Sequence, residues 1–374
     1  MHVPIGKPLF GAIEREYVND ALEKTEISGF SGGYTSKFEN AFAAFCGTKE
    51  AVTASNGTTA LHLALAALGI KEGDEIITQS FTNMATFFAV LYQNAIPVPV
   101  DSEPDTLNIN PALIEAKITS RTKAIMVVHI YGHPVDMDPI MALAKKHNLF
   151  VIEDAAEAHG AEYKGKRVGS IGDVGCFSFY ANKIITTGEG GMVTTNDSAL
   201  AEKMRSLKGL AFGKENKFMH ADIGYNYRMT NVQAAFGAAQ MTHADELVAK
   251  KRSIAGYYLE HLAGIPGLVL PIEKPYAKNV YWMFNILLDG PLKGKRAEFM
   301  RALAERGVET REDFIPFNDQ EIFIKRGLTQ TSDCPVASNA GVNGFYIPSG
   351  TDINDEEQAY VVAQIKEVVT TLTS

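Results

Sequence analysis

The sequence predicts an α/β protein with a mostly parallel sheet in a large domain, followed by a smaller α+β domain. Through the first two thirds of the chain, short β-branched runs alternate with longer segments of helical period, which is the pattern of βαβ units. From about residue 245 this alternation gives way to long helices around a single strand. We therefore expect a large domain at residues 1–245, with its N-terminal segment, and a small domain at 246–374.

The elements of the large domain can be placed in order. Residues 51–54 form a strand, 55–58 turn into a helix, and apolar residues from Leu61 to Leu68 recur there at helical spacing. Asp138 caps another helix, with Pro139 at its first position. Further strands are predicted at 124–130, 149–153, 174–179 and 191–195. Because helical segments separate most of these strands, the sheet should be mostly parallel.

The smaller domain contains the expected linker, at 264–267 with Pro271. Its expected elements are a helix at 247–262 before the linker, a strand at 280–288, a helix at 296–306 and a C-terminal helix. The C-terminal helix carries one apolar stripe formed by Val361, Val362, Ile365, Val368, Val369 and Leu372. This stripe should face the core of the small domain.

Charge and cysteine content exclude several classes of protein. A net charge of −9 has the wrong sign for binding nucleic acid or an anionic membrane. The start of the chain does not resemble a signal peptide, and no run of 18 apolar residues could span a bilayer, so we expect a cytoplasmic protein. Cys46, Cys176 and Cys334 are odd in number and far apart, which predicts three reduced, buried thiols.

A phosphate site is predicted where the strand at 51–54 turns into a helix. The sequence SNGTT at 55–59 directs unpaired backbone N–H groups and the positive helix end at one point. A plain helix cap would use the same residues. The chain contains neither G-x-G-x-x-G nor a P-loop sequence, which counts against dinucleotide and P-loop nucleotide chemistry.

Two further residues stand where chemistry is expected. Asp154 ends a buried strand, at the edge where open α/β sheets bind ligands, although it could simply cap the next turn. Lys183 lies between an aromatic strand and a Gly-rich turn, where exclusion of water should lower its pKa and favour a Schiff base. His159 fits a hydrogen-bonded scaffold imidazole. We expect no metal site, because Pro134 prevents a helix that would align His129 with His133.

Four segments occur in the order typical of one family: 55–61, 153–160, 177–191 and 224–229. The chain resembles the nucleotide-sugar aminotransferases of the DegT/DnrJ/EryC1/StrS group, which are pyridoxal-phosphate enzymes of fold type I. The similarity runs from about Pro8 to the C-terminus. Within the group, the stretches 177–183 and 279–283 look most like GDP-perosamine synthases.

The resemblance implies roles for individual residues. Lys183 carries the pyridoxal phosphate as a Schiff base, and Asp154 pairs with its protonated pyridine nitrogen. Glu157 lies beside the cofactor ring, near its 3-hydroxyl. The phosphate contacts Gly57, Thr58, Ser178 and, from the neighbouring subunit of a homodimer with shared active sites, Asn226. The substrate-binding residues implied are Ser31, Arg311 and Phe314.

The resemblance also implies a reaction. The amino group of L-glutamate would pass through the cofactor to C4 of a nucleotide-linked 4-keto-6-deoxy sugar. For the perosamine branch this is GDP-4-keto-6-deoxy-D-mannose, in O-antigen and lipopolysaccharide biosynthesis. Other readings are a UDP- or dTDP-linked acceptor, a related 3-dehydratase, and a non-catalytic sensor of pyridoxal phosphate. The dehydratase carries His in place of the lysine, so Lys183 favours transamination.

Two positions depart from the family pattern. Asn83 stands where relatives have an aromatic residue that lies against the cofactor ring, so Phe81 or Met84 could cover that face instead. Asn318 stands where relatives commonly have His. Both departures bear on how the sugar is recognised.

Overall fold

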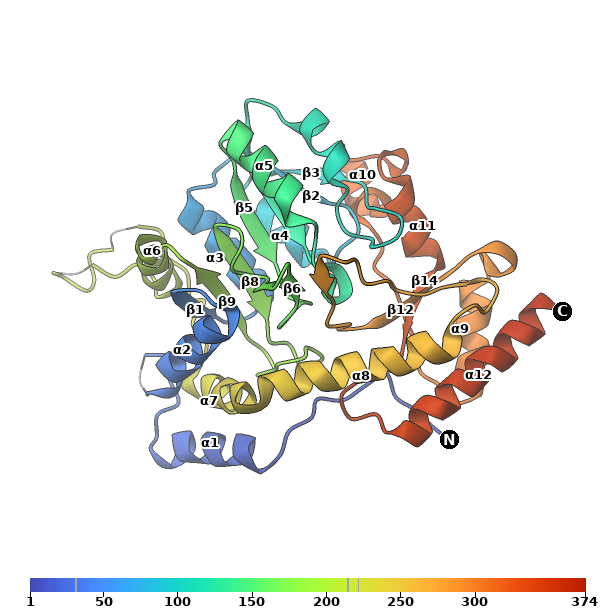
Figure 1. Ribbon diagram of the computed structural model, residues 1–374. Coiled ribbons are helices and arrows are strands. Elements are labelled where there is room, and N and C mark those ends of the chain that lie inside the picture. The colour runs from blue at the N-terminus through green and yellow to red at the C-terminus, as the bar shows by residue number, and fades with distance from the viewer. Residues whose placement is uncertain (31, 214, 221) are drawn as a thin grey trace.

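The computed structural model describes residues 1–374 except 31, 214 and 221, and it confirms the predicted α/β class (Figure 1). A seven-stranded sheet has the order β1-β9-β8-β5-β4-β2-β3. Its strands are β1 (Glu50–Ala54), β2 (Glu75–Gln79), β3 (Ile96–Val100), β4 (Thr122–Val128), β5 (Phe150–Asp154), β8 (Val174–Ser178) and β9 (Gly191–Thr195). β9 runs antiparallel to both its neighbours, and the other pairs are parallel. The sheet is therefore mostly parallel, as predicted.

Helices cover both faces of this sheet because successive strand residues point to opposite sides. Ala124 and Met126 pack with α3 (Gly57–Leu68), α4 (Ala85–Tyr92) and α6 (Ser198–Lys208). Ile125 and Val127 pack on the other side with α5 (Met137–His147). Near the aromatic strand β8, this second side also packs against α2 (Tyr34–Cys46), α7 (Asn231–Gln240) and α8 (Ala244–Leu262). α1 (Ala12–Glu23) lies against α7.

A second, antiparallel sheet lies in the C-terminal part of the chain. Its order is β10-β12-β14-β13, with β10 (Leu268–Val269), β12 (Phe284–Leu288), β13 (Arg311–Glu312) and β14 (Gly344–Ile347). It shares a core with α8, α9 (Arg296–Glu305) and α12 (Asp355–Thr373), and the predicted stripe of α12 packs there. α8 extends beneath both sheets (Figure 1). The domain boundary at residue 245 stays a prediction.

The remaining elements are short. α10 (Glu321–Lys325) and α11 (Pro335–Asn343) follow β13, and β6 (Glu162–Tyr163), β7 (Lys166–Arg167) and β11 (Ala277–Lys278) form a small separate sheet.

Three predicted boundaries were wrong. The strand expected at 280–288 begins only at Phe284, because Tyr281 has a φ of 49° that no extended strand accommodates. α5 begins at Met137, so Asp136 rather than Asp138 occupies the N-cap position. The strand expected at 124–130 ends at Val128, and a short 3₁₀ turn follows it.

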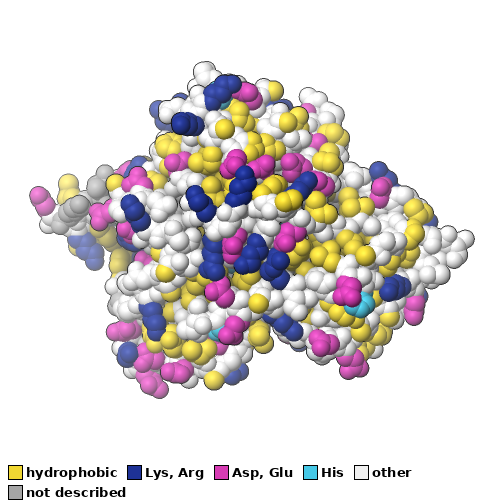
Figure 2. Space-filling model, in the orientation of Figure 1, with side chains coloured by type: hydrophobic (Ala, Val, Ile, Leu, Met, Phe, Trp, Pro, Cys, Tyr) yellow, Lys and Arg dark blue, Asp and Glu magenta, His cyan; other side chains and the backbone are white. Residues whose placement is uncertain are grey.

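Acidic and basic side chains are interspersed over the face shown in Figure 2. Within the described part of the chain, none of the helices combines the length and apolar character needed to cross a bilayer. All three cysteines are buried and free, as expected.

Candidate active site

The predicted site residues meet at one edge of the large sheet. β1, β5 and β8 end there, so the residues that follow each strand lie close together. Asn56 and Gly57 follow β1, Asp154 ends β5, and Ser178 ends β8. The loop after β8 then carries Lys183.

Asp154 is a buried carboxylate with a defined orientation. Its Oδ2 accepts a hydrogen bond from the Thr86 hydroxyl (2.8 Å), and its Oδ1 accepts one from the Ala156 N–H (3.2 Å). Burial raises the pKa of Asp154, while these two hydrogen bonds and the nearby Lys183 oppose the rise. The Asp154 carboxylate makes no ion pair within 4 Å in the described residues. A protonated ring nitrogen would supply the missing cation.

The start of α3 forms a cradle for an anion. Asn56 caps the helix by accepting from the Thr59 N–H (2.9 Å), and the amides of Gly57 and Thr58 belong to the first turn, where backbone N–H groups lack helical partners. A Cβ atom at Gly57 would come within 2.7 Å of the Ser178 Cβ. Glycine at this position therefore lets the Ser178 side chain pack directly against the start of α3. A phosphate group fits this cradle.

Lys183 lies in an enclosed environment between the two parts of the chain. Its backbone N–H donates to the Tyr180 carbonyl (2.9 Å), and its Nζ lies 3.5 Å from the ring centroid of Trp282. Burial lowers the pKa of Lys183, whereas Glu157 and Asp154 act to raise it. An amine held in this way reaches its nucleophilic, neutral form more readily than an ordinary lysine.

Glu157 is a second buried carboxyl group near Lys183. Its Oε2 accepts a hydrogen bond from the Tyr131 N–H (2.7 Å). Burial raises the pKa of Glu157 to about 7, although Lys183 and the Tyr131 N–H oppose the rise. Glu157 can therefore either donate or accept a proton near neutral pH.

The three histidines near the site have structural surroundings. His129 bonds Glu153 (3.1 Å) and the Val135 N–H (3.0 Å). His133 accepts from the Lys274 N–H (3.1 Å). The prediction of a hydrogen-bonded imidazole at His159 was wrong: neither ring nitrogen has a hydrogen-bond partner among the described residues, because the ring packs among Phe42, Phe177 and Phe179. Burial, together with Lys183, lowers the pKa of His159 to about 3.

A cavity of about 280 Å³ opens beside Lys183. It is lined by the N-terminal segment, by the loop after β8 and by residues of the C-terminal part, among them Lys251, Trp282, Arg311 and Tyr346. Of the three predicted substrate-binding residues, Arg311 lines this cavity. Phe314 lies behind it, stacked on Tyr131 at 5.7 Å between ring centroids. Ser31 lies outside the described residues.

The two departures from the family pattern have local explanations. Asn83 is exposed, and its Oδ1 accepts from the Ala85 N–H (3.0 Å) at the start of α4. Asn318 is fully buried, and its Oδ1 accepts from the Ser80 hydroxyl (2.6 Å). The Asn318 side chain therefore links the segment before α10 to the residue that follows β2, and it does not line the cavity.

Phe81 and Met84, which could replace the aromatic residue missing at position 83, both pack into apolar clusters. Phe81 is fully buried against Tyr131 and Phe314. Met84 packs with a small phenylalanine cluster around Phe317. Neither side chain lines the cavity beside Lys183.

Asn226 lies on an exposed loop away from the cavity. The flanking Tyr225 and Tyr227 stack on each other at 4.9 Å, and the Tyr227 hydroxyl bonds His62 of α3 (2.9 Å). Backbone hydrogen bonds from Tyr225 and Tyr227 fix the loop on the end of α6. The side chain of Asn226, which lies between the two tyrosines in the sequence, is exposed.

Trp282, Tyr346 and Lys251 also line the cavity, and none of them was predicted as a site residue. One signal was available for Trp282, because it is the chain's single tryptophan and stands in the distinctive stretch 279–283. Lys251 and Tyr346 carry no such signal: their position depends on how the second sheet packs against the first.

Comparisons with known proteins agree with this geometry. A profile of the DegT/DnrJ/EryC1/StrS aminotransferase family matches residues 10–366. GDP-perosamine synthase of Caulobacter vibrioides is 43% identical over 371 residues, which cover 98% of each chain. GDP-perosamine synthase of Escherichia coli O157:H7 is 43% identical over 366 residues, again covering 98% of each chain. These matches confirm the resemblance predicted from the sequence.

The solved structure of a similar protein identifies the cofactor. The PMP-form of the putative sugar aminotransferase Spr1654 from Streptococcus pneumoniae superposes with a TM-score of 0.95 at 25% identity, covering 100% of this chain and 98% of the other. The PMP form carries pyridoxamine phosphate, the aminated state of pyridoxal phosphate. Pyridoxal phosphate is the cofactor of this chain, and the α3 cradle, the unpaired Asp154 carboxylate and the Lys183 amine fit its three functional groups.

Proposed function

The chain belongs to the DegT/DnrJ/EryC1/StrS aminotransferase family and is a pyridoxal-phosphate-dependent sugar aminotransferase; from this premise we propose its substrates. It transfers the amino group of L-glutamate to C4 of GDP-4-keto-6-deoxy-D-mannose and so forms GDP-perosamine, a sugar for O-antigen polysaccharide. The observation that carries this proposal is the 43% identity to GDP-perosamine synthases along nearly the whole chain.

The sheet edge would hold the cofactor at three points. When bound, pyridoxal phosphate supplies an aldehyde carbon that condenses with amines and a ring that withdraws electrons. The amides of Gly57 and Thr58, with the Ser178 hydroxyl, would bind its phosphate. Asp154, held by Thr86, would keep the ring nitrogen protonated. Glu157 would face the 3-hydroxyl from its place beside Tyr131.

Lys183 would move the proton in both half-reactions. Its neutral amine would take the proton from the α-carbon of bound glutamate and carry it to the cofactor's C4′. With the keto sugar the direction reverses, and Lys183 returns a proton to C4 of the sugar. The lowered pKa of Lys183 favours the first transfer, since only the neutral amine accepts a proton.

The cavity suits substrates that carry negative charge. Besides Lys183, it is lined by Lys7, Arg311 and Lys251, whose pKa burial lowers to about 7, and the lining contains no carboxylate among the described residues. Glutamate brings two carboxylates and a nucleotide sugar brings a diphosphate, so both would be attracted. Because the two substrates bind in alternation, one set of cations can serve both.

A homodimer with shared active sites is part of this proposal. Asn226 would reach the phosphate of the partner subunit, as its exposed position on a fixed loop allows. Large apolar side chains near this loop are exposed, among them Phe30 (65%) and Ile223 (82%). Exposed apolar side chains of this size support a protein–protein interface.

Mixed dimers test the sharing of sites. Lys183→Ala and Asn226→Asp should each be nearly inactive alone, the second because a carboxylate would face the phosphate. Refolded together in equal amounts, half of the dimers would be mixed, each with one intact site, so activity should return to about a quarter of wild type. No recovery, with mixed dimers confirmed by native mass spectrometry, would mean that Asn226 does not act across the interface.

A substrate panel tests the reaction itself. The purified protein would be incubated with L-glutamate and GDP-, UDP- or dTDP-linked 4-keto sugars, and the products weighed by mass spectrometry. We expect an amino sugar from the GDP-linked substrate, at least tenfold faster than from the others. Faster amination of a UDP- or dTDP-linked sugar would overturn the GDP assignment. A deoxygenated product would indicate the dehydratase, and no product would favour a sensor.

A further inference from the structure

The indole ring of Trp282 lies directly against the Lys183 amine. The lysine Nζ lies over the indole face, 3.5 Å from the ring centroid, a geometry that attracts a cation to the aromatic ring. The indole Nε1–H donates to the carbonyl of Asn182 (2.8 Å), the residue that precedes the lysine. The ring is therefore bonded to the same loop whose amine it covers.

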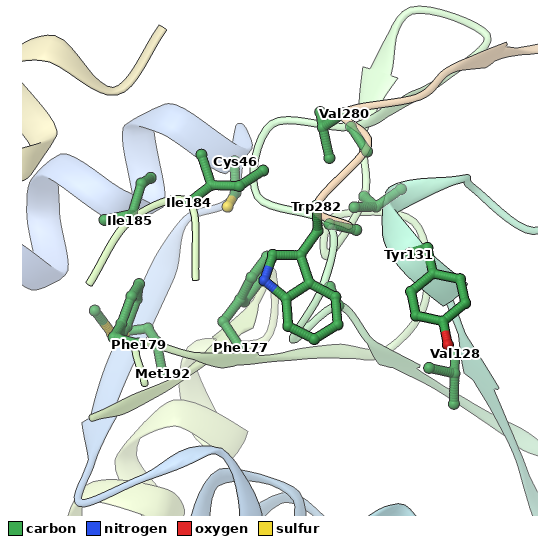
Figure 3. Packing of buried hydrophobic residues seen from close by; sticks show 14 of the residues in the cluster. Cys46, Val128, Tyr131, Phe177, Phe179, Ile184, Ile185, Met192, Val280 and Trp282 are labelled. Carbon is green, nitrogen blue, oxygen red and sulfur yellow. The ribbon is translucent and has the colours of Figure 1, made fainter. Parts of the chain in front are cut away.

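The backbone around Trp282 is strained so that the ring can take this position. Tyr281 and Tyr131 are both in the left-handed region, with φ of 49° and 51°. The two segments are joined by a hydrogen bond from the Trp282 N–H to the Tyr131 carbonyl (2.9 Å). A Cβ atom at Gly132 would lie 2.7 Å from Val280 Cγ2, so the close approach needs glycine there. Figure 3 shows the indole within the cluster that contains Tyr131 and Phe177.

We propose that Trp282 is a positioning residue that holds the Lys183 amine, by its aromatic face, whenever the lysine is released from the cofactor. The inference rests on the proposed function in one respect: each half-reaction frees the lysine and then needs its amine at the reacting carbon. A free lysine side chain has four rotatable bonds. Contact with the fixed indole keeps its amine near the site between steps.

Several charged and titratable groups around Lys183 affect its pKa. Glu157 and Asp154 face Lys183 from the large sheet, and His159 lies behind it. Lys7, Lys251, Arg311 and Tyr346 line the cavity beside the indole. The aromatic face stabilises the ammonium form and so raises the pKa of Lys183, against the lowering by burial. Removing the face while keeping an apolar side chain should lower that pKa further.

The first experiment compares Trp282→Phe, which keeps an aromatic face, with Trp282→Leu, which removes it. In cofactor-free full-length protein, the rate at which formaldehyde and a borane methylate Lys183 would be followed against pH by peptide mass spectrometry. Trp282→Phe should titrate as wild type does, and Trp282→Leu about 0.5 to 1.5 pH units lower. Phe299→Leu, a matched loss of a buried ring in the other core, should match wild type.

The second experiment needs no change at Trp282. Because the chain has a single tryptophan, its fluorescence reports on this ring alone. Emission of cofactor-free wild type should show a step as Lys183 loses its proton, and Lys183→Met should lack it. Glu157→Gln should keep the step, which separates the lysine from the neighbouring carboxyl group.

Three results would overturn the proposal: equal titration in Trp282→Leu and wild type, a higher lysine pKa in Trp282→Leu, or an unchanged emission step in Lys183→Met. Neither experiment uses a donor or a nucleotide sugar. A failure here therefore leaves the proposed reaction standing, and a failed substrate panel leaves the contact between Trp282 and Lys183 standing.

Discussion

The two walls of the site are built in different ways. One wall is the edge of the large sheet, where Asp154 ends β5, Ser178 ends the neighbouring strand β8, and Lys183 lies in the loop after β8. The other wall comes from the C-terminal part, where Trp282, Arg311 and Tyr346 lie on segments brought together by packing. In the proposed function, the first wall holds the cofactor and the second faces the substrates.

This difference between the walls separates residues that the chemistry needs from residues that determine which substrate binds. The sheet edge depends on strand ends and one helix start, so a change there removes a group that every half-reaction needs. On the opposite wall, Arg311 is exposed and paired across a short strand with Tyr346. Changes there should alter binding of one substrate and leave the cofactor in place.

The largest effect is expected from the sheet-edge wall at Lys183. Lys183→Ala should lack the yellow absorbance of the lysine-bound cofactor and show no measurable turnover, because the substitution removes the amine that would bond the cofactor and move the proton. Absorbance spectra and single-turnover assays would measure both. Lys166→Ala, an exposed lysine on β7, is the control and should behave as wild type. Normal turnover by Lys183→Ala would contradict the mechanism.

Asp154→Asn should have the next largest effect. The amide keeps the shape and can still accept from the Thr86 hydroxyl, but it loses the charge that keeps the ring nitrogen protonated. We expect cofactor to remain bound while turnover falls by about 10²-fold or more. Cofactor retention after gel filtration and steady-state rates are the measurements. Activity within a few-fold of wild type would remove Asp154 from this role.

The same contrast decides what the sequence could predict. At the sheet edge, SNGTT at 55–59 and the strand before Asp154 are local patterns, so their residues could be placed without knowing the rest of the fold. On the other wall, a strand was expected through residue 281, because a left-handed tyrosine leaves no pattern in composition. Asn318 was noted only as a departure from the family pattern, because its hydrogen bond with Ser80 joins residues 238 positions apart.

Arg311 tests the substrate wall. Arg311→Met removes a cation from the cavity rim, so KM for the sugar nucleotide should rise about 10- to 100-fold, the range expected for one hydrogen bond to a charged group, with kcat within a few-fold. Arg301→Met, an exposed arginine on α9, makes the same change of charge elsewhere and should leave KM unaltered. Equal effects of the two substitutions would show that only the net charge matters.

The smallest effect concerns stability and the neutral imidazole of His159 behind the sheet-edge wall. Its pKa is about 3 in the folded chain because it is buried beside Lys183, and the ordinary value is 6.5, so below pH 6.5 the unfolded chain gains a proton that the folded chain does not. Stability present above pH 6.5 is therefore lost as pH falls, by about 2 kcal/mol at pH 5 from this group alone.

His159→Phe keeps an aromatic ring among the phenylalanines and removes the titration. Urea unfolding of the full-length protein at pH 7 and pH 5 should show a drop smaller by about that amount in the variant. Phe is larger and lowers stability at both pH values, so the difference between them is the test. An equal drop in both proteins would mean that His159 takes up its proton in the folded state.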